Sequence, residues 1–340
     1  MTSNASARMR RALSTTSARK MAINLLALGI ICLVLSILSP RFASPENLWN
    51  VLRQISAVLI AGSAVTMLMV SGGLDLSVGG VLALSGVTAA LLSDQMPLPM
   101  AFLVATLVGA GIGLFNGFLT IIIGINAVIA TLGTMYVSRG SALLISNGVP
   151  VFDVPSGFKW LGTGYIGPVP VPVVVAAICL LVFTILERRT LLGRYSVAVG
   201  SNSTAAQLSG VPLRRTRFIL YTLAGAMAGL AGCVWASRIN SGLSTVGVGF
   251  EFDVIVATLL GGTSLLGGQG TVLGMAVGAL IVGVLNNGLN LLGVQSFWQT
   301  VALGTILVVA VGLDATLRRE DLAARFRRRR RSAGSAAASA

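Results

Sequence analysis

About ten continuous apolar stretches, separated by short turns, make up most of this chain of 340 residues. A helix needs about 20 mostly apolar residues to cross a bilayer, and the stretches lack the alternating pattern of barrel strands. Only 10% of the residues are charged, against roughly a quarter in a soluble domain, which excludes a water-soluble globular fold. We therefore predict an all-α polytopic membrane protein with about ten transmembrane helices. The predicted spans are 21–38, 54–70, 78–92, 100–123, 126–145, 171–186, 217–236, 252–266, 271–292 and 298–316.

The basic residues gather in three segments, and their positions predict the topology. The N-terminal tail, the central loop and the C-terminal tail hold most of the 24 Lys and Arg residues. The positive-inside rule places all three segments in the cytoplasm, which requires an even number of spans between neighbouring segments. Six predicted spans precede the central loop and four follow it, so both termini are expected in the cytoplasm. Segments 78–92 and 252–266 are short, and whether they cross fully stays open.

This topology divides the chain into three parts. Residues 1–20 form a basic cytoplasmic tail, residues 21–316 form the membrane domain with a cytoplasmic loop at 187–216, and residues 317–340 form an arginine-rich tail expected to be disordered. The net charge of +14 lies mainly in the tails and the loop, so we assign it to contact with anionic membrane lipid and expect no nucleic-acid partner.

The chain lacks the side chains that most covalent chemistry requires. It has no histidine, its three cysteines lie far apart in apolar stretches, and neither of its two lysines follows a phosphate-binding glycine loop. We therefore expect no catalytic residue, no metal site and no cofactor in this chain. Any ATP that drives its activity would be bound by another chain.

Charged side chains are scarce inside the predicted spans. The acidic residues fall at or near span ends, whereas an ion-coupled carrier needs a buried carboxylate or a cation site. Arg139 lies well inside the fifth apolar stretch, and we expect its side chain to reach an interface by snorkelling. This distribution favours a neutral cargo over a stand-alone ion-coupled carrier.

Small and amide side chains fill the predicted spans instead. Gly109 and Gly113, like Gly225 and Gly229, recur at the spacing that lets helix backbones approach closely in lipid. A buried amide needs a hydrogen-bond partner, which a neighbouring helix or a passing polar solute can supply. A translocation pathway and interhelical hydrogen bonding therefore both stay open for the asparagines. The candidates are Asn116, Asn286, Asn287 and Asn290.

Two glycine-rich turns end apolar stretches with related sequences. One reads Gly-Gly-Leu-Asp-Leu-Ser-Val-Gly-Gly from residue 72, and the other reads Gly-Gly-Thr-Ser-Leu-Leu-Gly-Gly from residue 261. Paired glycines break a helix, and an Asp followed by a Ser can cap the next one. Each turn is either a simple capped turn or a flexible joint at a cytoplasmic gate. The residues concerned are Gly72, Gly73, Asp75, Ser77, Gly261, Gly262, Gly267 and Gly268.

The central loop contains the signals of a short helix. Ser and Asn residues precede Ala-Ala-Gln-Leu, and Gly and Pro follow, which indicates an N-cap, a helical body and a stop. Such a helix is either a plain surface helix or a knob that docks into a groove on a partner protein. Its residues are Ala205, Ala206, Gln207, Leu208, Ser209 and Gly210.

Several of these strings together resemble the ribose/xylose/galactose-type permease subunits of bacterial ABC sugar importers. The resemblance runs from about residue 40 to residue 314, and the related branched-chain amino-acid permeases fit the first glycine turn less well. The strings that carry it are residues 72–79, 199–211, 223–232, 261–274 and 284–293.

The resemblance implies a multi-pass permease subunit of the bacterial inner membrane that imports a neutral monosaccharide by alternating access. Its implied partners are an ABC ATPase on the cytoplasmic loop, an extracytoplasmic sugar-binding protein, and a second permease copy in a homodimer or heterodimer. Residues 205–210 would form the coupling helix to the ATPase, and the turns at 72–79 and 261–268 would lie near the inner gate. Branched-chain amino acids, nucleosides or a furanose signal remain as alternative cargoes.

Overall fold

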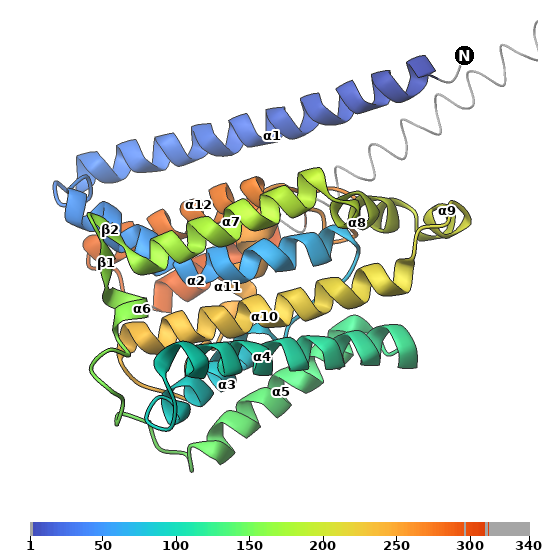
Figure 1. The fold of residues 1–340 in the computed structure, drawn as a ribbon. Helices are drawn as coiled ribbons and strands as arrows, with labels where there is room; N and C mark the ends of the chain where they lie inside the picture. Colours follow the sequence, from blue (N-terminus) through green and yellow to red (C-terminus); the bar gives the residue numbers. More distant parts are fainter. Residues whose placement is uncertain (1–2, 296, 310–311, 313–340) are drawn as a thin grey trace, which may run out of the picture.

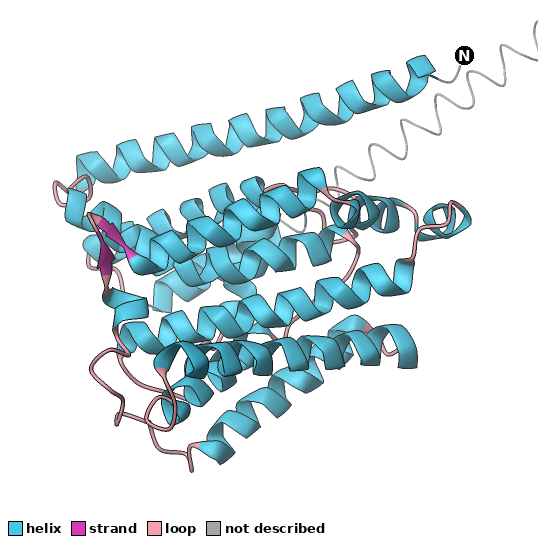
Figure 2. Cartoon of the chain, viewed as in Figure 1, coloured by secondary structure: helices cyan, strands magenta, loops and turns pink. Residues whose placement is uncertain are grey.

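The computed structural model describes residues 3–295, 297–309 and 312, and helices form nearly all of it (Figures 1 and 2). A two-stranded antiparallel hairpin joins β1 (Tyr165–Ile166) to β2 (Val169–Pro170). The helices are α1 (Ser3–Leu38), α2 (Pro45–Val70), α3 (Val78–Leu92), α4 (Leu98–Gly117), the π-helix η1 (Phe118–Ile123), α5 (Ala127–Ile145), α6 (Trp160–Thr163), α7 (Val171–Arg189), α8 (Leu191–Ser201), α9 (Ser203–Leu208), α10 (Leu213–Ile239), α11 (Phe250–Leu260) and α12 (Val272–Leu291).

Seven of the described helices are long and apolar enough to cross a bilayer. These seven are α1 from Met21, α2, α4 continued by η1, α5, α7, α10 and α12. The predicted spans 78–92 and 252–266 correspond to α3 and α11, which have 15 and 11 residues, fewer than the roughly 20 that a crossing needs. The prediction of about ten full crossings is therefore not confirmed.

The boundaries of the remaining predicted segments also shift. α1 begins at Ser3, so the first helix includes most of the predicted tail 1–20 instead of starting at residue 21. The last predicted span, 298–316, is a helix over Phe297–Val309, and the rest of it is largely outside the described residues. The predicted arginine-rich tail 317–340 lies wholly outside them.

Local sequence signals explain where several helices begin and end. Ser44 caps α2 by accepting a hydrogen bond from the Asn47 N–H, and a proline follows at the first helical position. α11 ends at Leu260 because Gly261 and Gly262 follow, and Gly262 has a φ of 87° that favours glycine. The glycine-rich turn therefore removes six residues from the predicted span 252–266.

Several helix pairs pack backbone against backbone, among them α4 with α10 and α11 with α12. A Cβ added at Gly109 of α4 would collide with the Gly225 carbonyl of α10, and one at Gly113 would collide with the Tyr221 carbonyl. A Cβ at Gly278 of α12 would likewise collide with the carbonyl of Ala257 in α11. The predicted close packing at small residues is thus confirmed for α4 with α10, and the structure adds further such pairs, including α11 with α12.

The bundle has two distinct ends. α8 and α9 project at one end, which we call the α9 end, and the β1–β2 hairpin with α6 lies at the other, the hairpin end (Figure 1). α10 runs between them and packs against α2, α3 and α4. The α2–α3 and α11–α12 connections, which hold the two glycine turns, both come to the α9 end.

Candidate functional site

The two glycine turns meet at the α9 end, although they lie far apart in the sequence. The Gly268 N–H donates a hydrogen bond of 2.7 Å to the Val70 carbonyl oxygen. A Cβ on Gly267 would lie 2.8 Å from the Gly72 nitrogen, so the two backbones touch. Gly72 and Gly267 both have positive φ angles, 78° and 84°, that favour glycine. We call this contact, residues 70–73 with 267–268, the glycine junction.

The central loop packs directly onto the glycine junction. A Cβ on Gly200 of α8 would collide with the Val70 carbonyl and would lie 2.5 Å from the Gly268 nitrogen. On the other side of the loop, the Arg217 guanidinium of α10 donates a hydrogen bond of 3.1 Å to the Ser71 carbonyl. α9 is joined directly to α8 on one side and to α10 on the other, and both of these helices contact the glycine junction. A displacement of α9 would therefore be transmitted to both turns.

α9 is the short helix that the sequence predicts, shifted by two residues to Ser203–Leu208. The Asn202 side chain caps it by accepting a hydrogen bond of 2.9 Å from the Ala205 N–H. Ser209 and Gly210, predicted as part of it, form the following turn. Ala206 is buried, whereas Leu208 is 86% exposed and its neighbours Ala205 and Gln207 are also exposed. An exposed apolar side chain on a projecting helix suits contact with another protein.

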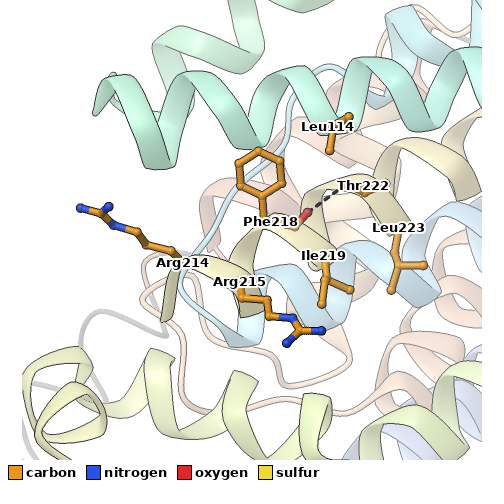
Figure 3. Close-up of a pocket in the computed structure, with 7 residues that line it drawn as sticks. All are labelled: Leu114, Arg214, Arg215, Phe218, Ile219, Thr222 and Leu223. Carbon is orange, nitrogen blue, oxygen red and sulfur yellow. Dashed lines mark hydrogen bonds between the residues drawn. The ribbon is translucent and has the colours of Figure 1, made fainter. Parts of the chain in front are cut away.

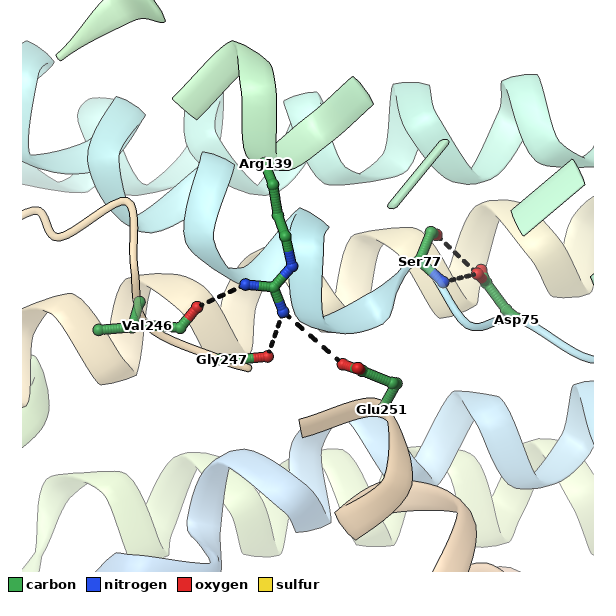
Figure 4. A network of polar contacts seen from close by, with 6 residues as sticks. All are labelled: Asp75, Ser77, Arg139, Val246, Gly247 and Glu251. Atoms are coloured by element: carbon green, nitrogen blue, oxygen red, sulfur yellow. Dashed lines mark hydrogen bonds and ion pairs between the residues drawn. The ribbon is translucent and has the colours of Figure 1, made fainter. Parts of the chain in front are cut away.

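Asp75 lies at the centre of a buried polar network. The Ser77 N–H and hydroxyl donate hydrogen bonds of 2.8 and 2.6 Å to Asp75 Oδ1 (Figure 4). The Asn116 amide donates to Ser77 Oγ at 2.9 Å, and the Thr134 hydroxyl donates to Asn116 Oδ1 at 2.7 Å. Ser77 occupies the N-cap position of α3, but its hydroxyl bonds to Asp75 instead of capping the helix. The network therefore ties the α2–α3 connection to α4 and α5.

Burial shapes the ionisation of Asp75, which lies in the connection between α2 and α3. The side chain is completely buried, and burial raises the pKa of the Asp75 carboxyl above its usual range. Hydrogen bonds from Ser77 and Asn116 lower the pKa and so oppose this effect. Asp75 does fall between two predicted spans, near the end of each, but its position in the sequence did not indicate this burial.

The four candidate pathway asparagines do not come together. Asn116 belongs to the Asp75 network, whereas Asn287 lies near the hairpin end and exchanges two hydrogen bonds of 2.9 Å with Asn47. Asn290 accepts a hydrogen bond of 2.7 Å from Gln299, and Asn286 is half-buried. The contacts of Asn116 and Asn287 are interhelical, and a pathway role for the four residues stays a prediction.

Arg139 turns into the protein, so the prediction of snorkelling is wrong. Its guanidinium donates hydrogen bonds to the Val246 and Gly247 carbonyls at 3.4 and 2.7 Å (Figure 4). It also lies 3.9 Å from Glu251 Oε2, with side-chain exposures of 17% for Arg139 and 8% for Glu251. A Cβ on Gly79 of α3 would collide with that carboxylate, so the glycine leaves the space that the pair occupies.

Carboxylates thus do lie buried in this protein, at Asp75 and Glu251. Sequence reasoning did not identify their burial, because Asp75 falls in a turn between two predicted spans and Glu251 falls just before another predicted span. The available signal was Gly79 in the first turn of α3, where the missing side chain leaves room for the Glu251 carboxylate and the Gly247 carbonyl. In the described part of the chain, no group of three or more His, Cys, Asp or Glu side chains could hold a metal ion.

A bundle with seven helices long and apolar enough to cross a bilayer, within the described residues, is that of a multi-pass membrane protein. Residues 47–311 match the family described as branched-chain amino acid transport system / permease component, and the chain belongs to this family. The protein is therefore a multi-pass inner-membrane permease. Its relatives are transport permeases, so the chain is a transport subunit and not by itself an enzyme.

Three relatives show the range of this similarity. The chain is 39% identical over 292 residues to the ribose import permease protein of Bacillus subtilis (strain 168), covering 85% of this chain and 91% of that protein. It is 36% identical over 291 residues to the D-allose transport system permease protein of Escherichia coli (strain K12), covering 84% and 89%. It is 34% identical over 306 residues to an autoinducer 2 import system permease protein of Salmonella paratyphi A, covering 88% and 92%.

Proposed function

We propose that this chain is the membrane-spanning subunit of an ATP-driven importer and carries a neutral monosaccharide inward by alternating access. Relatives named for ribose and allose import, at 39% and 36% identity, support a sugar cargo. The lower identity of 34% to an autoinducer 2 permease makes that signal the second candidate. The family description names branched-chain amino acids, which are the third.

The glycine junction is the observation that carries the mechanism. α9 offers an exposed docking surface, and α8 connects it to a point where both turns touch through Gly200. An ATPase that moves α9 would therefore move the two turns together and shift the population between outward-open and inward-open forms. No residue of this chain needs to bind ATP or perform covalent chemistry in this scheme.

Each end of the bundle would bind a different partner protein. The α9 end carries the basic loop, so the positive-inside rule supports a cytoplasmic position with an ABC ATPase bound there. The hairpin end would then face outward and receive an extracytoplasmic sugar-binding protein. A second permease copy, identical or homologous, would complete the importer.

Leu208→Asp tests the ATPase contact, because it places a charge on an exposed apolar position of α9 and leaves its buried residue, Ala206, unchanged. Ala206→Asp is unsuitable, since Ala206 is buried and its replacement would disturb the helix itself. We expect solubilised Leu208→Asp protein to capture about tenfold less candidate ATPase than the wild type. The matched control is Leu191→Asp, which changes an exposed leucine of α8, and it should capture the ATPase normally.

Uptake into proteoliposomes that contain the permease, the ATPase and the binding protein separates the remaining alternatives. Uptake of labelled ribose that requires ATP supports the proposed function. Uptake without the ATPase would identify an ion-coupled carrier instead, and uptake of leucine but not ribose would identify an amino-acid permease. If Leu208→Asp and wild type capture the ATPase equally, α9 does not bind the ATPase. The uptake assay would still identify the cargo.

A further inference from the structure

A groove of about 420 Å³ lies between α4 and α10 near the α9 end (Figure 3). Its walls are apolar and include Leu114 from α4 and Phe218, Ile219 and Leu223 from α10. Leu114 is 48% exposed and Ile219 is 39% exposed, so the groove opens on the outer face of the bundle. Its size is that of a site for an elongated organic molecule.

Two arginines stand at the edge of the groove. Arg214 and Arg215 are both exposed and both line it; Figure 3 shows Arg215 beside Ile219 and Arg214 extending away from the apolar wall. Within the described residues, neither guanidinium has an ion pair or a hydrogen bond to another side chain. The chain thus places two unmatched positive charges next to exposed apolar surface.

The position of these arginines in α10 increases the positive electrostatic potential around them, which favours binding of an anion. They lie in the first turn of α10, where the helix dipole already creates positive potential and where the sequence has no acidic residue. Arg217, in the next position but one, is already used by the Ser71 carbonyl. An anion from outside the chain would offset the charge of the other two.

We propose that this groove binds an anionic phospholipid, with its phosphate at Arg215, one acyl chain along Phe218, Ile219 and Leu223, and Arg214 adding to the positive potential at the edge. A free phosphate would leave the apolar wall uncovered, and a neutral lipid would leave the arginines unmatched. Basic pockets between transmembrane helices on the cytoplasmic side bind anionic lipid headgroups. A second copy placed symmetrically on this face would bring its own arginines against these two, so charge favours lipid over a dimer contact.

Lipid titration of the full-length protein, followed by native mass spectrometry, tests the site. Phosphatidylglycerol should bind about tenfold more tightly than phosphatidylcholine with the same acyl chains. In the double variant Arg214→Gln/Arg215→Gln, affinity for phosphatidylglycerol should fall about 30-fold, equivalent to about 2 kcal/mol. The control Arg188→Gln/Arg189→Gln removes the same charge from an exposed pair at the end of α7 and should stay within about threefold of wild type.

A second variant tests the apolar part of the groove. Ile219→Trp keeps both arginines but fills the space along the wall, so phosphatidylglycerol affinity should fall while thermal unfolding stays close to wild type. An equal loss of phosphatidylglycerol affinity in the Arg214/Arg215 and Arg188/Arg189 double variants would show general electrostatic attraction to the basic surface and would overturn the site. Equal affinity of the wild type for phosphatidylglycerol and phosphatidylcholine would also overturn it. So would an Arg214→Gln/Arg215→Gln variant that binds phosphatidylglycerol normally but shows a changed dimer fraction or changed ATPase capture.

Discussion

Arg139 and Glu251 show how charged residues become part of the interior of this protein. The sequence places Arg139 inside an apolar stretch and Glu251 just before another, but it names no partner for either. The contact depends on α5 and α11 both packing against α3, and on the space at Gly79 of α3. Short-range patterns report which face of a helix is apolar, whereas a buried partner is fixed only by the packing of distant segments.

Removing one member of this pair should destabilise the protein strongly. Arg139→Met leaves the Glu251 carboxylate buried without its partner, which we expect to lower the free energy of unfolding by about 3 kcal/mol. The double variant Arg139→Met/Glu251→Gln removes both charges and should recover much of that loss. Unfolding in mixed micelles, followed by circular dichroism, measures both. A double variant no more stable than Arg139→Met would show that the two charges do not stabilise one another.

At the scale of helices and turns, local signals were sufficient to find the parts of the candidate site. The glycine turns and the short helix α9 were each recognisable from a few neighbouring residues, such as the paired glycines at 261–262. That the turns meet and receive α8 was not predictable, because the Gly268–Val70 hydrogen bond joins distant segments. The bounds of α3 were predicted as the structure has them, whereas α11 was predicted too long, because its segment was extended into the glycine-rich turn at 261–266.

Gly200→Ala tests the connection between α8 and the glycine junction. The added methyl would collide with the Val70 carbonyl and push α8 away from both turns, while α9 keeps its exposed surface. We therefore expect normal ATPase capture but about tenfold slower ATP-dependent uptake. The control is Gly133→Ala on α5, where an added methyl meets nothing within 4 Å. Normal uptake by Gly200→Ala would mean that this contact does not transmit motion.

At the scale of the whole molecule, composition was enough to predict a helical multi-pass protein, and the extended motifs were enough to indicate its family. The number of crossings was harder, because hydropathy does not distinguish a full span from a shorter helix enclosed by others. α3 illustrates the difficulty: nearly all of its residues are buried, so its apolar character reflects contact with neighbouring helices and not with lipid.

The orientation of the bundle is open to a direct test. Ser209 at the α9 end and Ser156 near the hairpin end are both exposed, so a cysteine at either position should be reachable from one side of the membrane. In a background without Cys32, Cys179 and Cys233, a membrane-impermeant maleimide should label Ser156→Cys in intact spheroplasts. It should label Ser209→Cys only after the membrane is opened. The reverse pattern would contradict cytoplasmic termini and a cytoplasmic ATPase contact.

The side-chain-free contacts of α4 with α10 and of α11 with α12 limit how this protein can move. Where backbones touch through glycine, no rotamer change can absorb sliding, so each pair should behave as a solid block. Opening and closing would then be rigid rotations of one block against the other. The Gly268–Val70 hydrogen bond lies where α11–α12 approaches the end of α2, in the position of a pivot, and the distance between a spin label on α4 and one on α12 would report the swing.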